Sequence, residues 1–83
     1  MLKFLFFAQL ADDVGVQLMQ VDYIEGWQVQ QYLEKITAEN TALKTALLDD
    51  ESMMVSVNQS IAARSNVLAD GDEVGLLPPF SGG

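Results

Sequence analysis

The spacing of apolar residues changes period along the chain, and this change restricts the fold more than any other feature of the sequence. Residues 2–8 alternate between two faces, which is typical of a strand, and a second strand is expected over Val16–Tyr23. Gly15 marks the turn that would join the two strands as a hairpin. Residues 28–39 instead repeat apolar side chains every three or four positions, which predicts one principal helix. Its buried stripe comprises Val29, Tyr32, Leu33 and Ile36.

After a shorter helix, the chain returns to the alternation that is typical of strands. Asn40 is expected to cap the shorter helix, in which Leu43, Ala46 and Leu47 repeat the apolar stripe. The remaining expected elements are strands at Met53–Val57, Ser60–Ala63 and Glu73–Leu77, turns at Asn58-Gln59 and Asp70-Gly71-Asp72, and a return of Val67 and Leu68 toward the core. Strands on both sides of a principal helix predict an α+β fold, in which the helix covers one face of a sheet.

Alternation along the first and last strands directs some large apolar side chains away from the helix. The expected core face of the first strand comprises Leu2, Phe4, Phe6 and Ala8. Phe7 and, on the last strand, Leu77 then lie on the opposite face. We expect them to form an exposed apolar patch with Ile61 and Phe80, and patches of this kind commonly mark interaction sites.

Composition excludes most classes of catalytic site. The 83 residues suffice for one small domain, and they include neither Cys nor His. The chain therefore supplies no disulfide, no thiolate or imidazole nucleophile and no Ser-His-Asp triad. Asp49-Asp50-Glu51 offers too few oxygens for calcium, so we expect these carboxylates to face solvent and the chain to bind no metal or cofactor.

The charge balance limits the class of partner. Four basic residues against twelve acidic ones give a net charge of −8, which disfavours nucleic acid and anionic membranes. The acidity either favours a basic protein surface or only keeps a small domain soluble. Because no secretory leader pattern and no membrane-spanning apolar run is found, we expect a cytoplasmic protein.

The C-terminal residues carry the strongest indication of function. Pro78 and Pro79 end the last strand, because they lack backbone donors and fix an extended direction. Gly82 and Gly83 then form a terminus thin enough to enter a narrow channel, and its reactive group is the α-carboxylate of Gly83. A frayed and passive chain end is the alternative.

Residues 2–8, the Val57-Asn58-Gln59 turn and the stretch from Asp70 to Gly83 resemble the small, sulfur-carrier subunits of molybdopterin synthase. The most specific part is an ordered series of an Asp-Gly-Asp-Glu turn, an apolar strand, Pro-Pro and a terminal Gly-Gly. The resemblance implies the ubiquitin-like β-grasp fold, with the first and last strands adjacent. It also implies a domain over residues 1–79 and a flexible tail over residues 80–83.

The resemblance further implies that the chain is a protein cosubstrate and not a catalyst. In that family an E1-like adenylyltransferase uses ATP to activate the terminal glycine, here Gly83, and a sulfur donor converts it to a thiocarboxylate. The large synthase subunit, in a heterotetramer of two small and two large subunits, then transfers the sulfur to the cyclic pyranopterin monophosphate to build the molybdopterin dithiolene. Gly82 would thread the partner's channel. The implied partner interface comprises Phe7, Ile61, Leu77, Pro78, Pro79, Phe80 and Ser81.

Two other interpretations stay open. A thiamine-pathway sulfur carrier or a ubiquitin-like protein modifier would share the fold and the diglycine terminus. A β-grasp interaction module would share the fold but carry a passive tail. The Phe6-Phe7-Ala8 start and Pro78-Pro79 favour the molybdopterin carrier.

Overall fold

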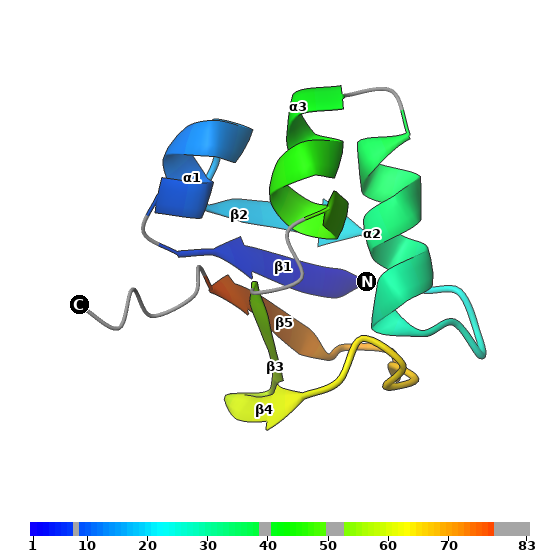
Figure 1. The fold of residues 1–83 in the computed structure, drawn as a ribbon. Coiled ribbons are helices and arrows are strands. Elements are labelled where there is room, and N and C mark those ends of the chain that lie inside the picture. The colour runs from blue at the N-terminus through cyan, green and yellow to red at the C-terminus, as the bar shows by residue number, and fades with distance from the viewer. Residues whose placement is uncertain (8, 39–40, 50–52, 78–83) are drawn as a thin grey trace.

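A mixed sheet is the centre of the fold. The computed structural model describes residues 1–7, 9–38, 41–49 and 53–77, and within them five strands pair in the order β2-β1-β5-β3-β4 (Figure 1). The strands are β1 Leu2–Phe6, β2 Leu18–Val21, β3 Met54–Val57, β4 Ser60–Ala62 and β5 Glu73–Leu77. β1 and β5 run parallel to each other, and the other neighbouring pairs are antiparallel. The predicted adjacency of the first and last strands is therefore confirmed.

Helices lie on one side of this sheet (Figure 1). The principal helix, α2, spans Val29–Thr37, as the periodicity predicts. The shorter helical segments are α1 Gln9–Val14 and α3 Thr41–Lys44, which continues as the π-helical turn η1 Thr45–Asp49. A mixed sheet packed on one principal helix is the ubiquitin-like β-grasp arrangement that the resemblance implies.

The core lies between α2 and the inner face of the sheet. Its fully buried side chains include Leu2, Phe4, Val74 and Leu76 from the strands and Val29, Tyr32 and Leu33 from α2. This set confirms the predicted strand parity and the predicted helical stripe. Trp27 is half-buried at the start of α2, where its ring meets Tyr32 edge-on at a centroid distance of 5.3 Å. It packs against the core from this position.

The loop between β4 and β5 fixes the N-terminus of α2. The first N–H groups of a helix have no partner within the helix, so other groups must accept from them. Here the N–H of Val29 donates to the Asn66 carbonyl at 3.0 Å, and the N–H of Gln30 donates to the Arg64 carbonyl at 2.9 Å. These hydrogen bonds connect the principal helix to the segment that leads into β5.

The prediction that β1 and β2 are joined by a simple hairpin turn is wrong. The two strands do pair in antiparallel fashion, but helix α1 lies between them. Leu10 is buried, and Ala11 and Val14 pack against the core, so the segment contributes one apolar face. Gly15 has φ +92° and its N–H donates to the Ala11 carbonyl, which makes it the residue that ends α1.

Other element boundaries differ by a few residues. β2 begins at Leu18 and not at Val16, whose side chain is exposed. Leu68 is buried as expected, but the prediction for Val67 is wrong, because that side chain is 56% exposed. The helix α3 and its η1 continuation confirm a second helical segment, and Leu47 is buried there. Ala8 and Asn40 lie outside the described residues.

Candidate functional site

The last strand, β5, leads directly into the C-terminal segment and is held from both sides. Leu76 pairs with Phe6 on β1 and with Val55 on β3. The Phe7 N–H, just beyond β1, also donates to the Leu76 carbonyl at 3.1 Å. The described part of the chain ends at Leu77, directly after this pairing. Pro78, Pro79, Phe80, Ser81, Gly82 and Gly83 lie outside the described residues.

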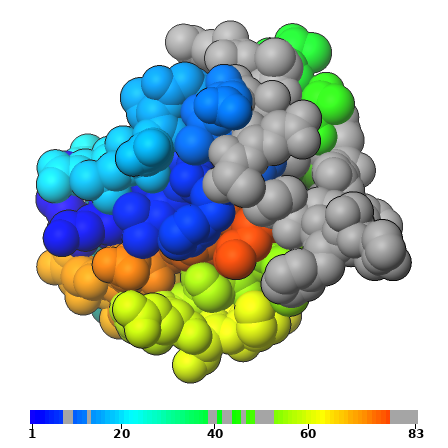
Figure 2. All heavy atoms as spheres, turned by 90° about the vertical axis from the view of Figure 1, so that its left-hand side faces the viewer, coloured from blue at the N-terminus to red at the C-terminus, as the bar shows by residue number. Residues whose placement is uncertain are grey.

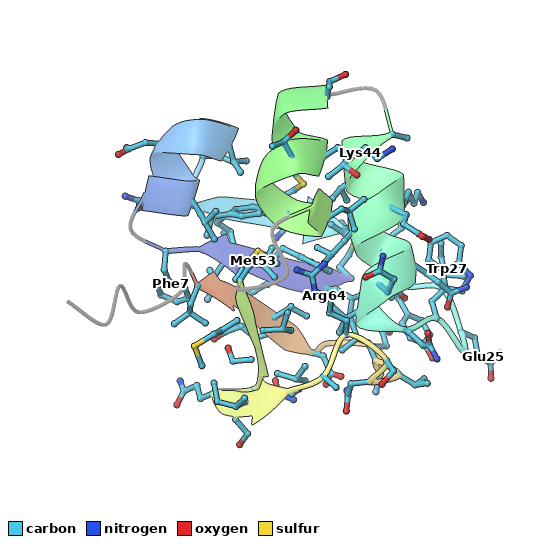
Figure 3. All side chains as sticks on the ribbon, viewed as in Figure 1. Phe7, Glu25, Trp27, Lys44, Met53 and Arg64 are labelled. Carbon is cyan, nitrogen blue, oxygen red and sulfur yellow. The ribbon has the colours of Figure 1, made fainter. Side chains whose placement is uncertain are left out.

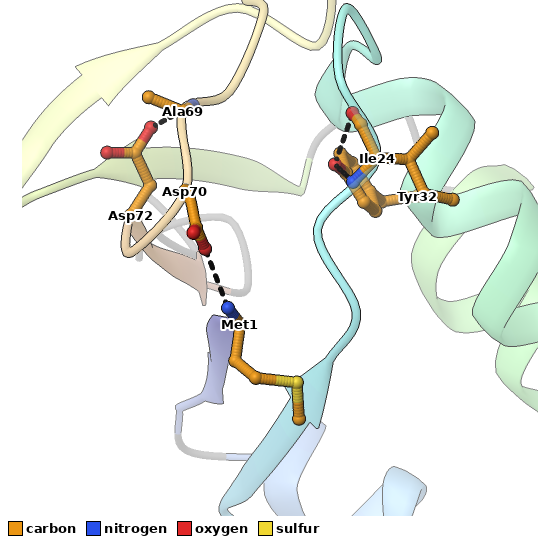
Figure 4. A network of polar contacts seen from close by, with 6 residues as sticks. All are labelled: Met1, Ile24, Tyr32, Ala69, Asp70 and Asp72. Carbon is orange, nitrogen blue, oxygen red and sulfur yellow. Dashed lines mark hydrogen bonds and ion pairs between the residues drawn. The ribbon is translucent and has the colours of Figure 1, made fainter.

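The start of β5 is fixed by the motif residues that carry the resemblance. The Asn58 amide donates to Asp72 Oδ1 at 3.0 Å, and the Asn58 side-chain oxygen accepts from the Glu73 N–H at 3.1 Å. Asp72 Oδ2 in turn accepts from the Ala69 N–H at 2.8 Å (Figure 4). The Val57-Asn58-Gln59 turn and the Asp-Gly-Asp-Glu turn thus contact each other. Their role in the described structure is to position the strand that leads to the tail.

On the outer face of the sheet, the strand registers define a row of side chains that crosses all the described strands. Leu5 pairs with Leu18 and with Gly75, Gly75 pairs with Ser56, and Ser56 pairs with Ile61. In order from β2 to β4 the row is therefore Leu18, Leu5, Gly75, Ser56 and Ile61. Apolar side chains lie at its two ends, and the two smallest residues lie in the middle.

A second row lies nearer to the tail. Met54 pairs with Leu77, and Phe7 lies just beyond the end of β1, beside the point where β5 ends (Figure 3). The Phe7 side chain is 44% exposed, and those of Leu77 and Met54 are half-buried. We define the outer apolar patch as Leu5, Phe7, Leu18, Met54, Ile61 and Leu77. Figure 2 shows this end of the molecule, with β1 in blue, the end of β5 in red and β3 and β4 in yellow-green side by side.

Gly75 is the point at which two predicted interface residues meet. A Cβ atom built on Gly75 would lie 3.1 Å from Phe7 Cε2 and 3.8 Å from Leu77 Cδ1. Phe7 and Leu77 therefore approach the same position above β5. Ile61 is 68% exposed on the same face, but the strands β5 and β3 separate it from Phe7. The partner role of these residues stays a prediction, whereas their place on the outer face follows from the parity of the strands.

Sequence reasoning missed three members of the outer apolar patch. Leu5 and Leu18 face each other across β1 and β2, and Met54 faces Leu77. Leu5 already had the same strand parity as Phe7, and this parity could have identified it. Met54 shares its strand face with two polar residues, Ser56 and Asn58, so the sequence pattern indicates a polar face at this position. Only the strand register shows that its nearest partner is apolar.

A shallow hollow of about 430 Å³ adjoins Phe7 on the side of α1. It is lined by Leu5, Phe6, Phe7, Ala11, Asp12 and Gln17. The hollow exists because α1 leaves the sheet directly after β1, with the Phe7 carbonyl accepting from the Leu10 N–H at 3.1 Å. It extends the outer apolar patch with a rim that includes one carboxylate, Asp12.

Acidic groups gather at the other end of β5. The Met1 ammonium group is 2.6 Å from Asp70 Oδ1, in the turn that precedes the strand (Figure 4). Partial burial raises the pKa of the nearby Tyr23 phenol, and the carboxylates of Glu25, Asp70 and Asp72 raise it further. The strand therefore runs from a polar, acidic end to an apolar end at the base of the tail.

Neither a metal centre nor a membrane span is found in the described segments. Among these residues, no group of three or more carboxylate, Cys or His side chains is arranged to hold a metal ion. Asp50 and Glu51 of the acidic run lie outside the described residues. No described helix is long and apolar enough to cross a membrane.

Comparisons with known proteins agree with this geometry. The ThiS family model matches residues 4–83. The chain is 32% identical to the molybdopterin synthase sulfur carrier subunit of Escherichia coli strain K12, over the full length of both proteins. It is also 32% identical to the small archaeal modifier protein 1 of Haloferax volcanii, over 93% of this chain and 94% of that protein. The crystal structure of that archaeal protein has a TM-score of 0.85 at 30% identity and covers 99% of this chain and 98% of that one. The chain therefore belongs to the ThiS family, in which it is similar along its whole length to molybdopterin synthase sulfur carrier subunits.

Proposed function

We propose that this chain is the sulfur-carrier subunit of a molybdopterin synthase, and that Gly83 carries the sulfur as a thiocarboxylate. The observation that supports this most directly is the arrangement around β5. The central strand is held on both sides, leads into a Pro-Pro-Phe-Ser-Gly-Gly terminus and lies beside an exposed apolar surface. A rigid domain that presents a thin reactive terminus beside a docking surface suits a carrier that visits the sites of other proteins.

The chemistry follows from the weakness of a carboxylate as an electrophile. Sulfur cannot displace oxide from Gly83, so the terminus first reacts with ATP, releasing pyrophosphate and forming an acyl-adenylate. A sulfur nucleophile then displaces AMP and leaves the thiocarboxylate. The acyl-adenylate must be kept from water, because hydrolysis would otherwise compete with sulfur transfer. A narrow partner channel that admits only Gly82 and Gly83 provides that exclusion.

The partners supply the catalytic groups. The chain has no Cys or His, so we assign adenylation to an E1-like adenylyltransferase and the supply of sulfur to a separate donor. The large synthase subunit then transfers sulfur from the thiocarboxylate to the cyclic pyranopterin monophosphate, and water restores the carboxylate of Gly83. These steps take place within an assembly of two small and two large subunits in the cytoplasm. The similarity to the sulfur carrier subunit of Escherichia coli molybdopterin synthase supports a place for this chain beside a second synthase subunit.

The partner surface in this proposal is the outer apolar patch. Its large apolar side chains are exposed or half-buried in the described structure, so a partner that covers them removes apolar area from water. Phe7 and Leu77 lie at the end of β5, the strand that leads into the C-terminal segment, and Ile61 extends the surface toward β4. Pro78, Pro79, Phe80 and Ser81 would continue the contact from the patch to the partner's channel.

The test is the intact mass of the chain after reaction with its adenylating partner, ATP and a sulfur donor. The expected product differs from the starting chain by the exchange of one oxygen for sulfur at Gly83. A chain that lacks Gly83, and a chain with one residue added after it, should stay unmodified while remaining folded. Normal sulfur transfer by the extended chain, without trimming, would show that the terminus is not the carrier.

The likeness to the archaeal modifier protein favours one other candidate function. A protein modifier would use the same activated Gly83, but the nucleophile would be a lysine amine of a target protein. The two functions separate when the tagged chain is expressed with its native partners. Because the terminus reads Phe80-Ser81-Gly82-Gly83, chymotryptic cleavage after Phe80 leaves a Ser-Gly-Gly remnant on the target lysines of a modifier, whereas a dedicated sulfur carrier gives the thiocarboxylate without such remnants.

A further inference from the structure

Gly75 occupies a position where its own backbone does not require glycine. It lies in the interior of β5, paired on both sides, and its φ is outside the left-handed region that favours glycine. Glycine weakens a strand interior, and it often marks a place where another group approaches the backbone closely. The side chains that cover position 75 must therefore explain why glycine occupies it.

Three side chains cover Gly75 on the outer face of the sheet. A Cβ atom at this position would collide with Ser56 Oγ and would lie 3.1 Å from Phe7 Cε2, with Leu77 Cδ1 at 3.8 Å. The Ser56 hydroxyl lies on a short side chain that can turn away. The backbone of Phe7, from which the ring projects, is fixed by main-chain hydrogen bonds to Leu76 and to Leu10. A side chain at position 75 therefore presses against both Ser56 and the Phe7 ring, and against the Phe7 ring once the Ser56 hydroxyl is removed.

This contact offers an exposed aromatic side chain a fixed place on the sheet. Phe7 is 44% exposed, and an aromatic ring with so little cover would ordinarily exchange between rotamers. A side chain that is already ordered loses less conformational entropy when a partner binds it. The missing side chain of Gly75 leaves the space in which the ring lies across β5.

We propose that Gly75 is a positioning residue that pre-orders Phe7 for partner binding. The inference rests on the proposed function, since it takes the outer apolar patch as the surface that the large synthase subunit covers. Gly75 acts through Phe7 and need not touch the partner itself. A change at position 75 therefore weakens binding only while the Phe7 ring is present.

A double-mutant cycle tests this dependence. All proteins in the cycle carry Ser56→Ala, which removes the collision with the Ser56 hydroxyl. Ser56→Ala alone is the reference. The three variants add Gly75→Val, Phe7→Ala, or both substitutions to it. We expect Gly75→Val to weaken binding to the large subunit by about tenfold when Phe7 is present, and to have almost no further effect in the Phe7→Ala background. Calorimetric titration measures the affinities, and the thermal midpoint of each variant shows that it is folded.

A spectroscopic measurement on the free chain reports the contact without any partner. In the Ser56→Ala reference, the Phe7 ring current should shift the Gly75 Hα resonances relative to those of the Phe7→Ala variant, and nuclear Overhauser effects should connect the two residues. Phe7→Ala should remove both signals while the remaining backbone spectrum persists. Gly75→Ala provides a milder change if Gly75→Val fails to fold, and it should displace the ring by less and weaken binding by less.

The outcomes are distinct. Equal losses of affinity from Gly75→Val with and without Phe7, or no loss in either background, would overturn the role of Gly75 while leaving the proposed function intact. An unchanged affinity for Phe7→Ala would instead show that the partner does not bind at Phe7. Gly75 could then have no role in positioning Phe7 for that partner. Absence of the Phe7–Gly75 signals in the free chain would also overturn it.

Discussion

Tyr32 in α2 and Tyr23 in the loop before it carry the same phenol group but lie in different surroundings. The Tyr32 hydroxyl accepts from the Ile24 N–H at 2.7 Å and donates to the Ile24 carbonyl at 2.9 Å, so a buried polar group is fully used (Figure 4). Tyr23 is only half-buried, and it lies among the carboxylates that surround the turn before β5. Tyr32 therefore fixes the loop before α2, whereas Tyr23 is sensitive to the local charge.

The environment of Tyr23 predicts a loss of stability at alkaline pH. Burial and then the neighbouring carboxylates raise its pKa in the folded chain, so the folded state holds the phenol proton more tightly than the unfolded state. The resulting stabilisation is fully present below the unfolded value of about 10 and is lost as the pH rises through the folded value. Thermal midpoints measured across that range should fall more steeply for the wild-type chain than for Tyr23→Phe. Parallel curves for the two proteins would contradict the prediction.

At the scale of elements, the turn between β3 and β4 has two separable functions. Asn58 and Gln59 have φ of 50° and 71°, the left-handed pair of a tight two-residue hairpin turn. The Asn58 side chain also holds the start of β5 through Asp72 and Glu73. One residue thus shapes a hairpin and connects it to the strand that leads to the tail.

Substitutions at Asn58 should separate these two functions. Asn58→Gly keeps the favourable backbone conformation but removes both side-chain hydrogen bonds, so we expect a loss of about 1–2 kcal/mol in the free energy of unfolding. Asn58→Ala removes the same bonds and adds the strain of a left-handed non-glycine residue, at about 1 kcal/mol more. Urea unfolding measures both values. Equal stabilities of the two variants would show that the backbone conformation contributes little.

At the scale of the whole molecule, the sequence predicted what depends on local periodicity and missed what depends on packing between distant segments. The apolar stripe of α2 and the alternation along β1 and β5 predicted that a helix packs on one face of a sheet. The same alternation predicted that Phe7 and Leu77 point away from that helix. Helix α1 was missed because its six residues carry a short apolar stripe, which only the neighbouring core makes helical. The contributions of Leu18 and Met54 to the outer apolar patch depend on the strand register, which the sequence pattern does not specify.

The two faces of β5 should respond differently to truncation, because one face packs in the core and the other is open to a partner. Leu76 is fully buried, so Leu76→Ala should lower the free energy of unfolding by about 2–5 kcal/mol. Its neighbour Leu77 is half-buried on the outer face, so Leu77→Ala should weaken binding to the large subunit by about 1–4 kcal/mol with a smaller effect on stability.

Ile61→Ala serves as the matched control for this pair, since Ile61 is the most exposed member of the outer apolar patch and contributes little to the core. Its thermal midpoint should stay close to that of the wild-type chain. Its affinity for the large subunit should fall, because the proposed partner surface extends to Ile61 on β4. Unfolding curves and titrations on the same preparations separate the two effects. A large loss of stability in Leu77→Ala, with normal binding by the folded fraction, would mean that the outer face of β5 supports the fold and that the partner surface lies elsewhere.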